Sequence, residues 1–144
     1  MKRHTLRGRV DPNTVKRLVV DDGRFTHAMR IVGFHVAGDP TSSAGDCYAA
    51  LSTTPDFPIP WDWSDNRQVA WAAYGNQDTP GHGVDYSIID PDRVIVSDLY
   101  IRGDHKGGGA TNFINYMVIL EAMTITEDEA VLQLIKERAQ DDLR

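Results

Sequence analysis

The sequence contains a single cysteine, Cys47, among its 144 residues, so no disulfide can form within the chain. This fits a reducing compartment, or a fold that is stable without a covalent cross-link. Long apolar runs are also missing, and none approaches the roughly 20 residues that a transmembrane helix needs. The first ten residues carry basic side chains but no apolar segment, so they do not match a secretory signal. We therefore expect no membrane partner.

Residue motifs that are typical of catalytic sites are also missing. None of the five histidines has the spacing of a zinc site, and the glycines at 107–109 lack the Lys-Ser/Thr ending of a phosphate-binding loop. His105 beside Asp104 is the best candidate for a ligand or a base, although a solvated loop histidine is the simpler interpretation. The sequence thus predicts no enzyme and no cofactor.

A calcium site is also disfavoured. Asp62, Ser64 and Asn66 have the spacing of the first three ligands of a calcium-binding loop. Such a loop then needs a glycine and a final glutamate, where this chain has Arg67 and Ala73. We therefore expect no bound metal.

The longest nearly continuous apolar run spans residues 113–120 and is interrupted only by Asn115. Side chains alternate between the two faces of a strand, and here both faces are largely apolar. A strand of this kind is typical of the middle of a sheet that is covered on both sides. We therefore expect a central strand here, followed by a covering helix.

The helix is predicted over residues 127–140. Thr126 and Glu129 match a capping box, in which each side chain binds the other residue's backbone N–H. Leu132 lies outside the apolar stripe, so it is either an ordinary exposed leucine or a contact to a neighbouring subunit. The predicted core stripe of this helix consists of Ala130, Val131, Leu134 and Ile135.

Short β-rich runs separated by turns make up the rest of the chain. Asp21-Asp22-Gly23 is typical of a hairpin turn, and Gly33 inside a run indicates a bulge. We expect one domain over residues 1–144, an antiparallel β-sandwich or jelly roll of about seven to eight strands with one C-terminal α-helix, which either closes an open end or packs on one sheet. The expected strands before the core run are Thr5–Val10, Thr14–Val20, Arg24–Ala37, Cys47–Thr53, Gln68–Tyr74, Asp85–Ile89 and Arg93–Arg102.

Charge is distributed unevenly. Residues 1–30 contain eight Lys or Arg and three Asp, a net +5, so the remainder carries −11 of the total of −6. We predict a basic N-terminal arm at residues 1–13, which can meet nucleic acid or an acidic neighbouring subunit. The basic residues of the arm are Lys2, Arg3, Arg7 and Arg9.

The proline-rich loop at residues 55–66 carries two tryptophans, Trp61 and Trp63, on either side of Asp62. Aromatic rings on a sandwich loop can stack on sugars, and such a site would use Trp61, Trp63 and Asp62. The favoured interpretation is that these rings fill the end of the sandwich or an interface, since aromatic side chains supply large buried areas. A carbohydrate-binding module is therefore the alternative hypothesis.

Three segments together resemble small structural proteins of marine bacteriophages and related environmental viruses: the W-D-W-x-D-N loop at 61–66, the N-Y-x-x-x-L-E strand at 115–121 and the T-x-x-E helix at 126–140. The resemblance implies a virion protein, a small coat or capsid-decoration subunit that is assembled in the host cytoplasm. Its partners would be other copies of itself or other capsid proteins. The expected contact residues are Lys2, Arg3, Arg7, Arg9, Trp61, Trp63 and Leu132.

Overall fold

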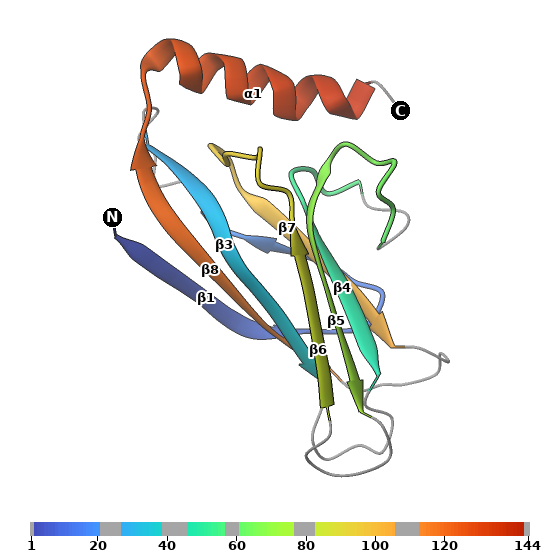
Figure 1. Ribbon diagram of the computed structural model, residues 1–144. Coiled ribbons are helices and arrows are strands. Elements are labelled where there is room, and N and C mark those ends of the chain that lie inside the picture. Colours follow the sequence, from blue (N-terminus) through green and yellow to red (C-terminus); the bar gives the residue numbers. More distant parts are fainter. Residues whose placement is uncertain are drawn as a thin grey trace.

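The computed structural model describes residues 2–20, 27–38, 46–56, 61–76, 83–105 and 113–142. Within them the chain forms eight strands and one helix (Figure 1). These are β1 (Arg3–Val10), β2 (Val15–Leu18), β3 (His27–Gly38), β4 (Cys47–Ser52), β5 (Gln68–Asn76), β6 (Gly83–Ile89), β7 (Leu99–His105), β8 (Ile114–Thr124) and α1 (Glu127–Asp142).

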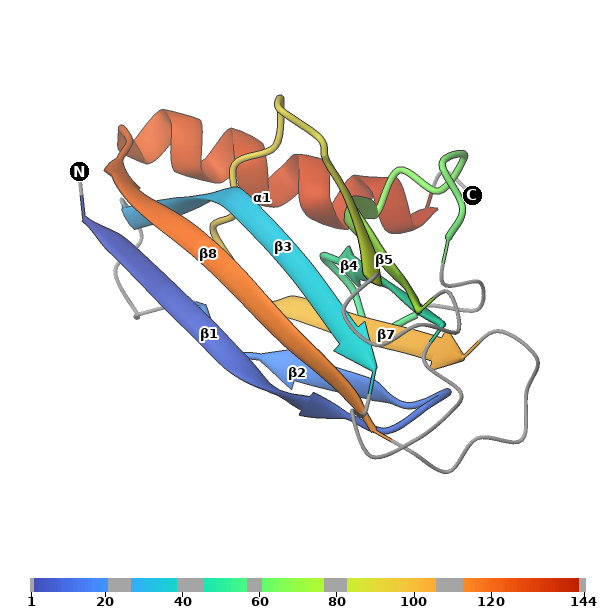
Figure 2. The same cartoon turned by 60° about the horizontal axis from the view of Figure 1, so that its bottom comes forward.

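The strands make two antiparallel sheets. One has three strands in the order β1-β8-β3, and the other has five in the order β2-β7-β4-β5-β6. Figures 1 and 2 show the two sheets as separate layers, with α1 lying across one end. This arrangement confirms the predicted antiparallel β-sandwich with one C-terminal helix.

The core lies between the two sheets. From β8, alternate residues Ile114, Tyr116, Val118 and Leu120 point inward and are buried. They meet inward-facing side chains of the other sheet, such as Leu51 of β4. Strand β8 is central in its sheet, as predicted, but its second face is not covered, because Met117 on that face is 37% exposed. The prediction of cover on both sides was wrong because α1 leaves β8 toward the end of the sandwich.

Helix α1 begins at the predicted capping box. The Glu129 N–H donates to Thr126 Oγ1 at 3.2 Å, and the Thr126 N–H donates to Glu129 Oε2 at 3.3 Å. Ala130 is fully buried beside Ile125, where the helix meets the sandwich. The rest of the predicted stripe was partly wrong, because the helix touches the sandwich along a narrow line. Leu134 is half-buried, whereas Val131 and Ile135 are exposed.

Strand pairing at the start of the chain differs from the hairpin prediction. Strand β2 pairs with β7 and β3 pairs with β8, so β2 and β3 belong to different sheets. The predicted turn at 21–23 lies outside the described residues, but it does not join a paired hairpin. The bulge prediction is confirmed, since the register of β3 against β8 shifts between Ile31 and Gly33.

The strand expected from Arg93 begins only at Leu99. The preceding segment makes an isolated bridge between Ile95 and Met29. Next to it, the buried Asp98 carboxylate accepts from Arg17 Nε at 2.6 Å and from the Val20 N–H at 2.9 Å. These contacts tie the end of β2 to the segment before β7.

Candidate functional site

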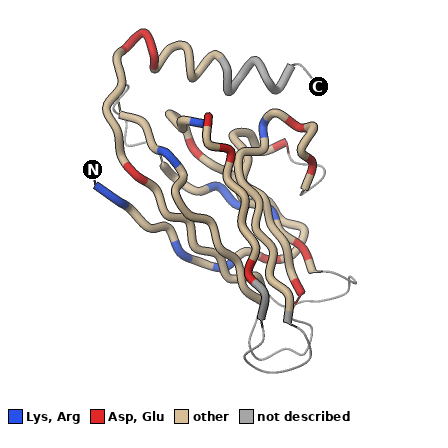
Figure 3. Tube along the Cα trace, in the orientation of Figure 1, with Lys and Arg blue, Asp and Glu red and all other residues tan. Residues whose placement is uncertain are grey.

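The predicted basic arm contains strand β1, so its arginines are fixed on a sheet. Alternation places the side chains of Arg3, Arg7 and Arg9 on the solvent side, where all three are exposed. Arg3 forms an ion pair with Glu121 at 3.5 Å, and the Arg9 guanidinium lies 4.5 Å from the centre of the Phe113 ring. Figure 3 shows the cations along β1, away from the acidic start of α1.

These arginines lie along one side of an exposed methionine. Met117 of β8 is the cross-strand partner of Arg7 on β1 and of His35 on β3. A shallow groove of about 480 Å³ runs between β1 and β8 beside Arg7, Arg9 and Met117. Arg30 of β3 is also exposed and lies across Glu121 from Arg3. We call this surface the basic sheet face and define it by Arg3, Arg7, Arg9, Arg30 and Met117.

Helix α1 presents a second unpaired surface. Val131, Leu132 and Ile135 are 44%, 51% and 56% exposed. Asp128 precedes them by three, four and seven residues, so all four side chains lie on one side of the helix. We call these four residues the helix stripe. Leu132 is therefore part of a larger exposed apolar surface than the sequence indicated.

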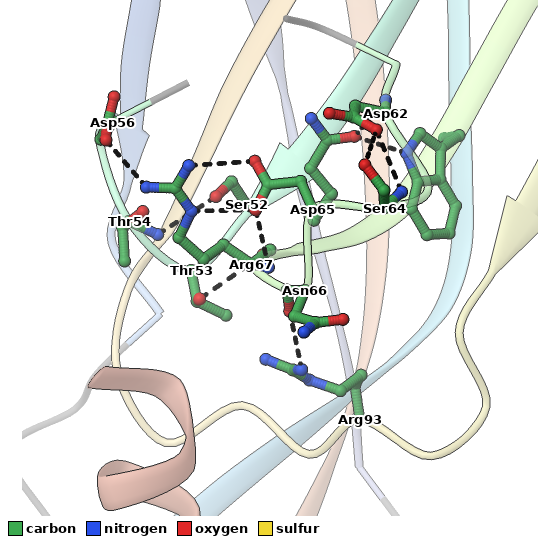
Figure 4. A network of polar contacts seen from close by, with 12 residues as sticks. Ser52, Thr53, Thr54, Asp56, Asp62, Ser64, Asp65, Asn66, Arg67 and Arg93 are labelled. Atoms are coloured by element: carbon green, nitrogen blue, oxygen red, sulfur yellow. Dashed lines mark hydrogen bonds and ion pairs between the residues drawn. The ribbon is translucent and has the colours of Figure 1, made fainter. Parts of the chain in front are cut away.

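The loop between β4 and β5 is built around a buried arginine (Figure 4). The Arg67 side chain is completely buried, and its Nε and Nη2 donate to the two carboxylate oxygens of Asp65 at 2.9 and 3.1 Å. Its Nη1 donates to Asp56 at 2.9 Å. Such a two-pronged contact fixes both side chains geometrically. Sequence reasoning missed this network, because it considered Arg67 only as a substitute for glycine.

The polar residues of the loop bind one another. Asp62 Oδ1 accepts from the Ser64 N–H at 3.0 Å and from Ser64 Oγ at 2.5 Å. Gln68 Oε1 accepts from the Asp62 N–H at 2.9 Å and from Trp71 Nε1 at 2.7 Å. The carboxylate of Asp62 thus shapes a turn. Among the described residues, no group of three or more His, Cys, Asp or Glu is placed to hold a metal ion.

The tryptophans lie over the outer face of the five-stranded sheet. Trp61 stacks on Tyr86 with ring centres 6.3 Å apart, and Trp63 meets Trp71 edge-on at 6.2 Å. Trp63 remains 63% exposed. The two predicted stacking residues therefore belong to an aromatic cluster that also draws on β5 and β6, which the loop sequence alone did not indicate.

His105, the histidine that the sequence offered as a ligand or base, is the last residue of β7 and is buried. The expectation of a solvated loop histidine was therefore wrong. The cross-strand partner of His105 is Cys47. Burial, with a smaller effect from Asp46, raises the pKa of the Cys47 thiol to about 12. The thiol therefore stays protonated near neutral pH, which does not suit a cysteine nucleophile.

The predicted contact residues do not gather at one place. Lys2, Arg3, Arg7 and Arg9 belong to the edge of the three-stranded sheet, the tryptophans lie on the five-stranded sheet, and Leu132 lies on the helix. The fold thus defines a β-sandwich that displays three separate surfaces.

Comparisons with protein-family models, with curated proteins and with solved structures gave no match for this chain. In the part of the chain that the structure describes, no helix has the length and apolar character to cross a membrane.

Proposed function

We propose that this chain is a virion structural protein, a small coat or capsid-decoration subunit that acts by self-association rather than by catalysis. The observation that carries the proposal is the complementarity of the basic sheet face and the helix stripe. The resemblance of three segments to structural proteins of marine bacteriophages supports the same role. In this role the protein resides in the virion after assembly in the host cytoplasm.

The two surfaces match in chemistry. The helix stripe offers three exposed apolar side chains headed by Asp128, with Glu127 and Glu129 beside it. The basic sheet face offers exposed Met117 beside Arg7 and Arg9. Contact between the two surfaces would remove apolar area from water and set opposite charges against each other.

The geometry of such a contact suits a lattice. The helix stripe of one copy would bind the sheet face of the next copy, so the two contacting patches would differ. Repeated head-to-tail contacts of this kind generate rings or open arrays, whereas a patch that binds itself gives only a closed dimer.

Light scattering on matched variants tests the proposal. The wild-type chain should exceed monomer size at low salt and shrink at high salt, because exposed charges are screened beyond about 8–10 Å near physiological ionic strength. Leu132→Glu with Ile135→Glu should abolish association, and so should Arg7→Glu with Arg9→Glu. Val19→Glu is the matched control, because Val19 is 66% exposed but belongs to neither surface.

Mixing the two double variants gives the sharpest result. Each variant keeps one intact surface, so the mixture should form a one-to-one dimer that cannot grow. A wild-type chain that stays monomeric at every salt and concentration, and that also fails to bind purified particles of a virus carrying its gene, would contradict the proposal.

Nucleic acid is the competing partner for the basic sheet face. Binding to phosphates would weaken steeply with salt, and the arginine variants would lose it while the helix variants would not. That outcome would assign the arginines to genome contact instead of subunit contact.

A further inference from the structure

A pocket of about 270 Å³ opens on the outer face of the five-stranded sheet. Cys47 and Ala49 of β4 point into the core, so Tyr48 between them points outward. Tyr48 is the cross-strand partner of Ala73 on β5, and Ala73 is the partner of Tyr86 on β6. Two tyrosines therefore stand on either side of a small residue, and all three line the pocket.

The spacing of the tyrosines leaves room for one six-membered ring. Neighbouring strands lie about 4.8 Å apart, so β4 and β6 are separated by about 9.6 Å. A ring held between two aromatic side chains needs about 3.5–4.0 Å on each side, or about 7–8 Å between the aromatic planes. The pocket is also open at Gly75, because a Cβ added there would have Asp46 Oδ1, at 3.8 Å, as its nearest neighbour.

The tyrosine on β6 has a fixed orientation. Trp61 stacks on its ring with an angle of 17° between the planes. Tyr86 is 50% exposed, so its aromatic surface is also presented to solvent. Trp61 is thus a positioning residue, and the exposed Trp63 lies beyond the pocket lining.

The charged side chain that lines the pocket is the carboxylate of Asp46. Asp104 on β7, the other cross-strand partner of Tyr48, lies outside the lining. Carboxylates accept hydrogen bonds from hydroxyl groups but repel anions. We infer that this pocket binds one ring of a neutral pyranose sugar within a glycan, with its C–H faces against Tyr48 and Tyr86 and its hydroxyls toward Asp46. This role is independent of the proposed assembly.

Binding is measured by ligand-observed saturation-transfer NMR and by tryptophan fluorescence. The probes are neutral trisaccharides of glucose, mannose, galactose, xylose and N-acetylglucosamine, with trigalacturonate as the anionic counterpart. At least one neutral trisaccharide should bind, and trigalacturonate should not. Tyr48→Ala and Tyr86→Ala should each weaken binding about tenfold or more through the lost ring contact.

Two further variants separate pocket binding from loop binding and from misfolding. A Cβ at Gly75 would clash with no neighbouring atom, so Gly75→Leu should fold. Its side chain would occupy the pocket and should therefore block binding. Trp63→Ala should leave the affinity unchanged. The inference is overturned if no neutral trisaccharide binds, if Gly75→Leu binds like the wild type, or if Trp63→Ala abolishes binding while Tyr48→Ala does not.

Discussion

Replacing Asp65 by alanine tests the buried ion pair that holds the loop between β4 and β5. The Asp65 side chain is 1% exposed and that of Arg67 is 0% exposed, so both charged groups are shielded from solvent. The substitution removes two guanidinium contacts and the bond from the Arg67 N–H at 3.1 Å. Arg67 would keep only its contact to the exposed Asp56, and removing the buried partner of a buried charge costs about 3–5 kcal/mol. This is a large part of a typical folding free energy of about 5–15 kcal/mol.

The same guanidinium supplies a matched control. Asp56 also accepts from Arg67, but its side chain is 65% exposed. Exposed ion pairs contribute about 0–1 kcal/mol, so Asp56→Ala should have little effect. Urea unfolding followed by circular dichroism measures both variants. With a slope of about 1–3 kcal/mol per molar urea, only Asp65→Ala should move the midpoint by a molar unit or more.

A double variant identifies the cause of the loss. If the cost comes from a buried guanidinium that has lost its buried carboxylate, then Asp65→Ala combined with Arg67→Met should be less destabilising than the sum of the single changes. Equal losses for Asp65→Ala and Asp56→Ala, or strict additivity in the double variant, would refute this account of the network.

Three further substitutions probe the cap, the core and the thiol. Thr126→Ala should lower the free energy of unfolding by about 1 kcal/mol, because it removes the oxygen that accepts at the helix start; an unchanged urea midpoint would show that another group caps the helix. Val118→Ala should cost about 2–4 kcal/mol in the same assay through lost burial and a cavity, and a loss well below 1 kcal/mol would contradict its place in the core. Burial raises the pKa of the Cys47 thiol from 9.0 to about 12. Above pH 9 the thiol therefore loses its proton in the unfolded state but keeps it in the folded state. The free energy of unfolding should fall as pH rises from 9 toward 12, and it should fall less steeply in Cys47→Ala.

The features that the sequence predicted well depend on neighbours along the chain. The capping box involves residues three positions apart, so Thr126 and Glu129 define it without any tertiary information. The bulge at Gly33 and the apolar run of β8 can likewise be predicted from residues that are adjacent in the sequence. The number of strands and the sandwich class follow from these local patterns and the turns between them.

The failures involve partners distant in sequence. The Asp21-Asp22-Gly23 signal favoured a hairpin, but register with β7 and β8 decides where the flanking strands pair. For the same reason the loop alone could not show that Trp61 would stack on Tyr86. The buried arginine is an exception, because its main partner Asp65 lies only two residues away, but the sequence does not show that both side chains are buried.

The position of the helix is the most informative comparison. The sequence predicted a helix that either closes an open end of the sandwich or packs on one sheet, and α1 lies across one end, which leaves both Met117 and the helix stripe exposed. In the proposed assembly, α1 of one copy covers β8 of its neighbour, so packing of a helix on a sheet forms between chains. In that assembly the apolar side chains of the helix stripe are buried between two chains and not within one chain.

Disulfide trapping tests that contact directly. Met117→Cys combined with Leu132→Cys, in a Cys47→Ala background, should form cross-linked ladders under mild oxidation, because each chain offers one thiol to each neighbour. A disulfide requires Cα atoms about 4.4–6.8 Å apart, so only a docked helix brings the two positions together. Moving the helix thiol to Gln133, which is half-buried on the side away from the stripe, provides the control. Ladders of equal yield from the control, or their absence from the paired variant at concentrations where the wild type associates, would show that the copies meet through other surfaces.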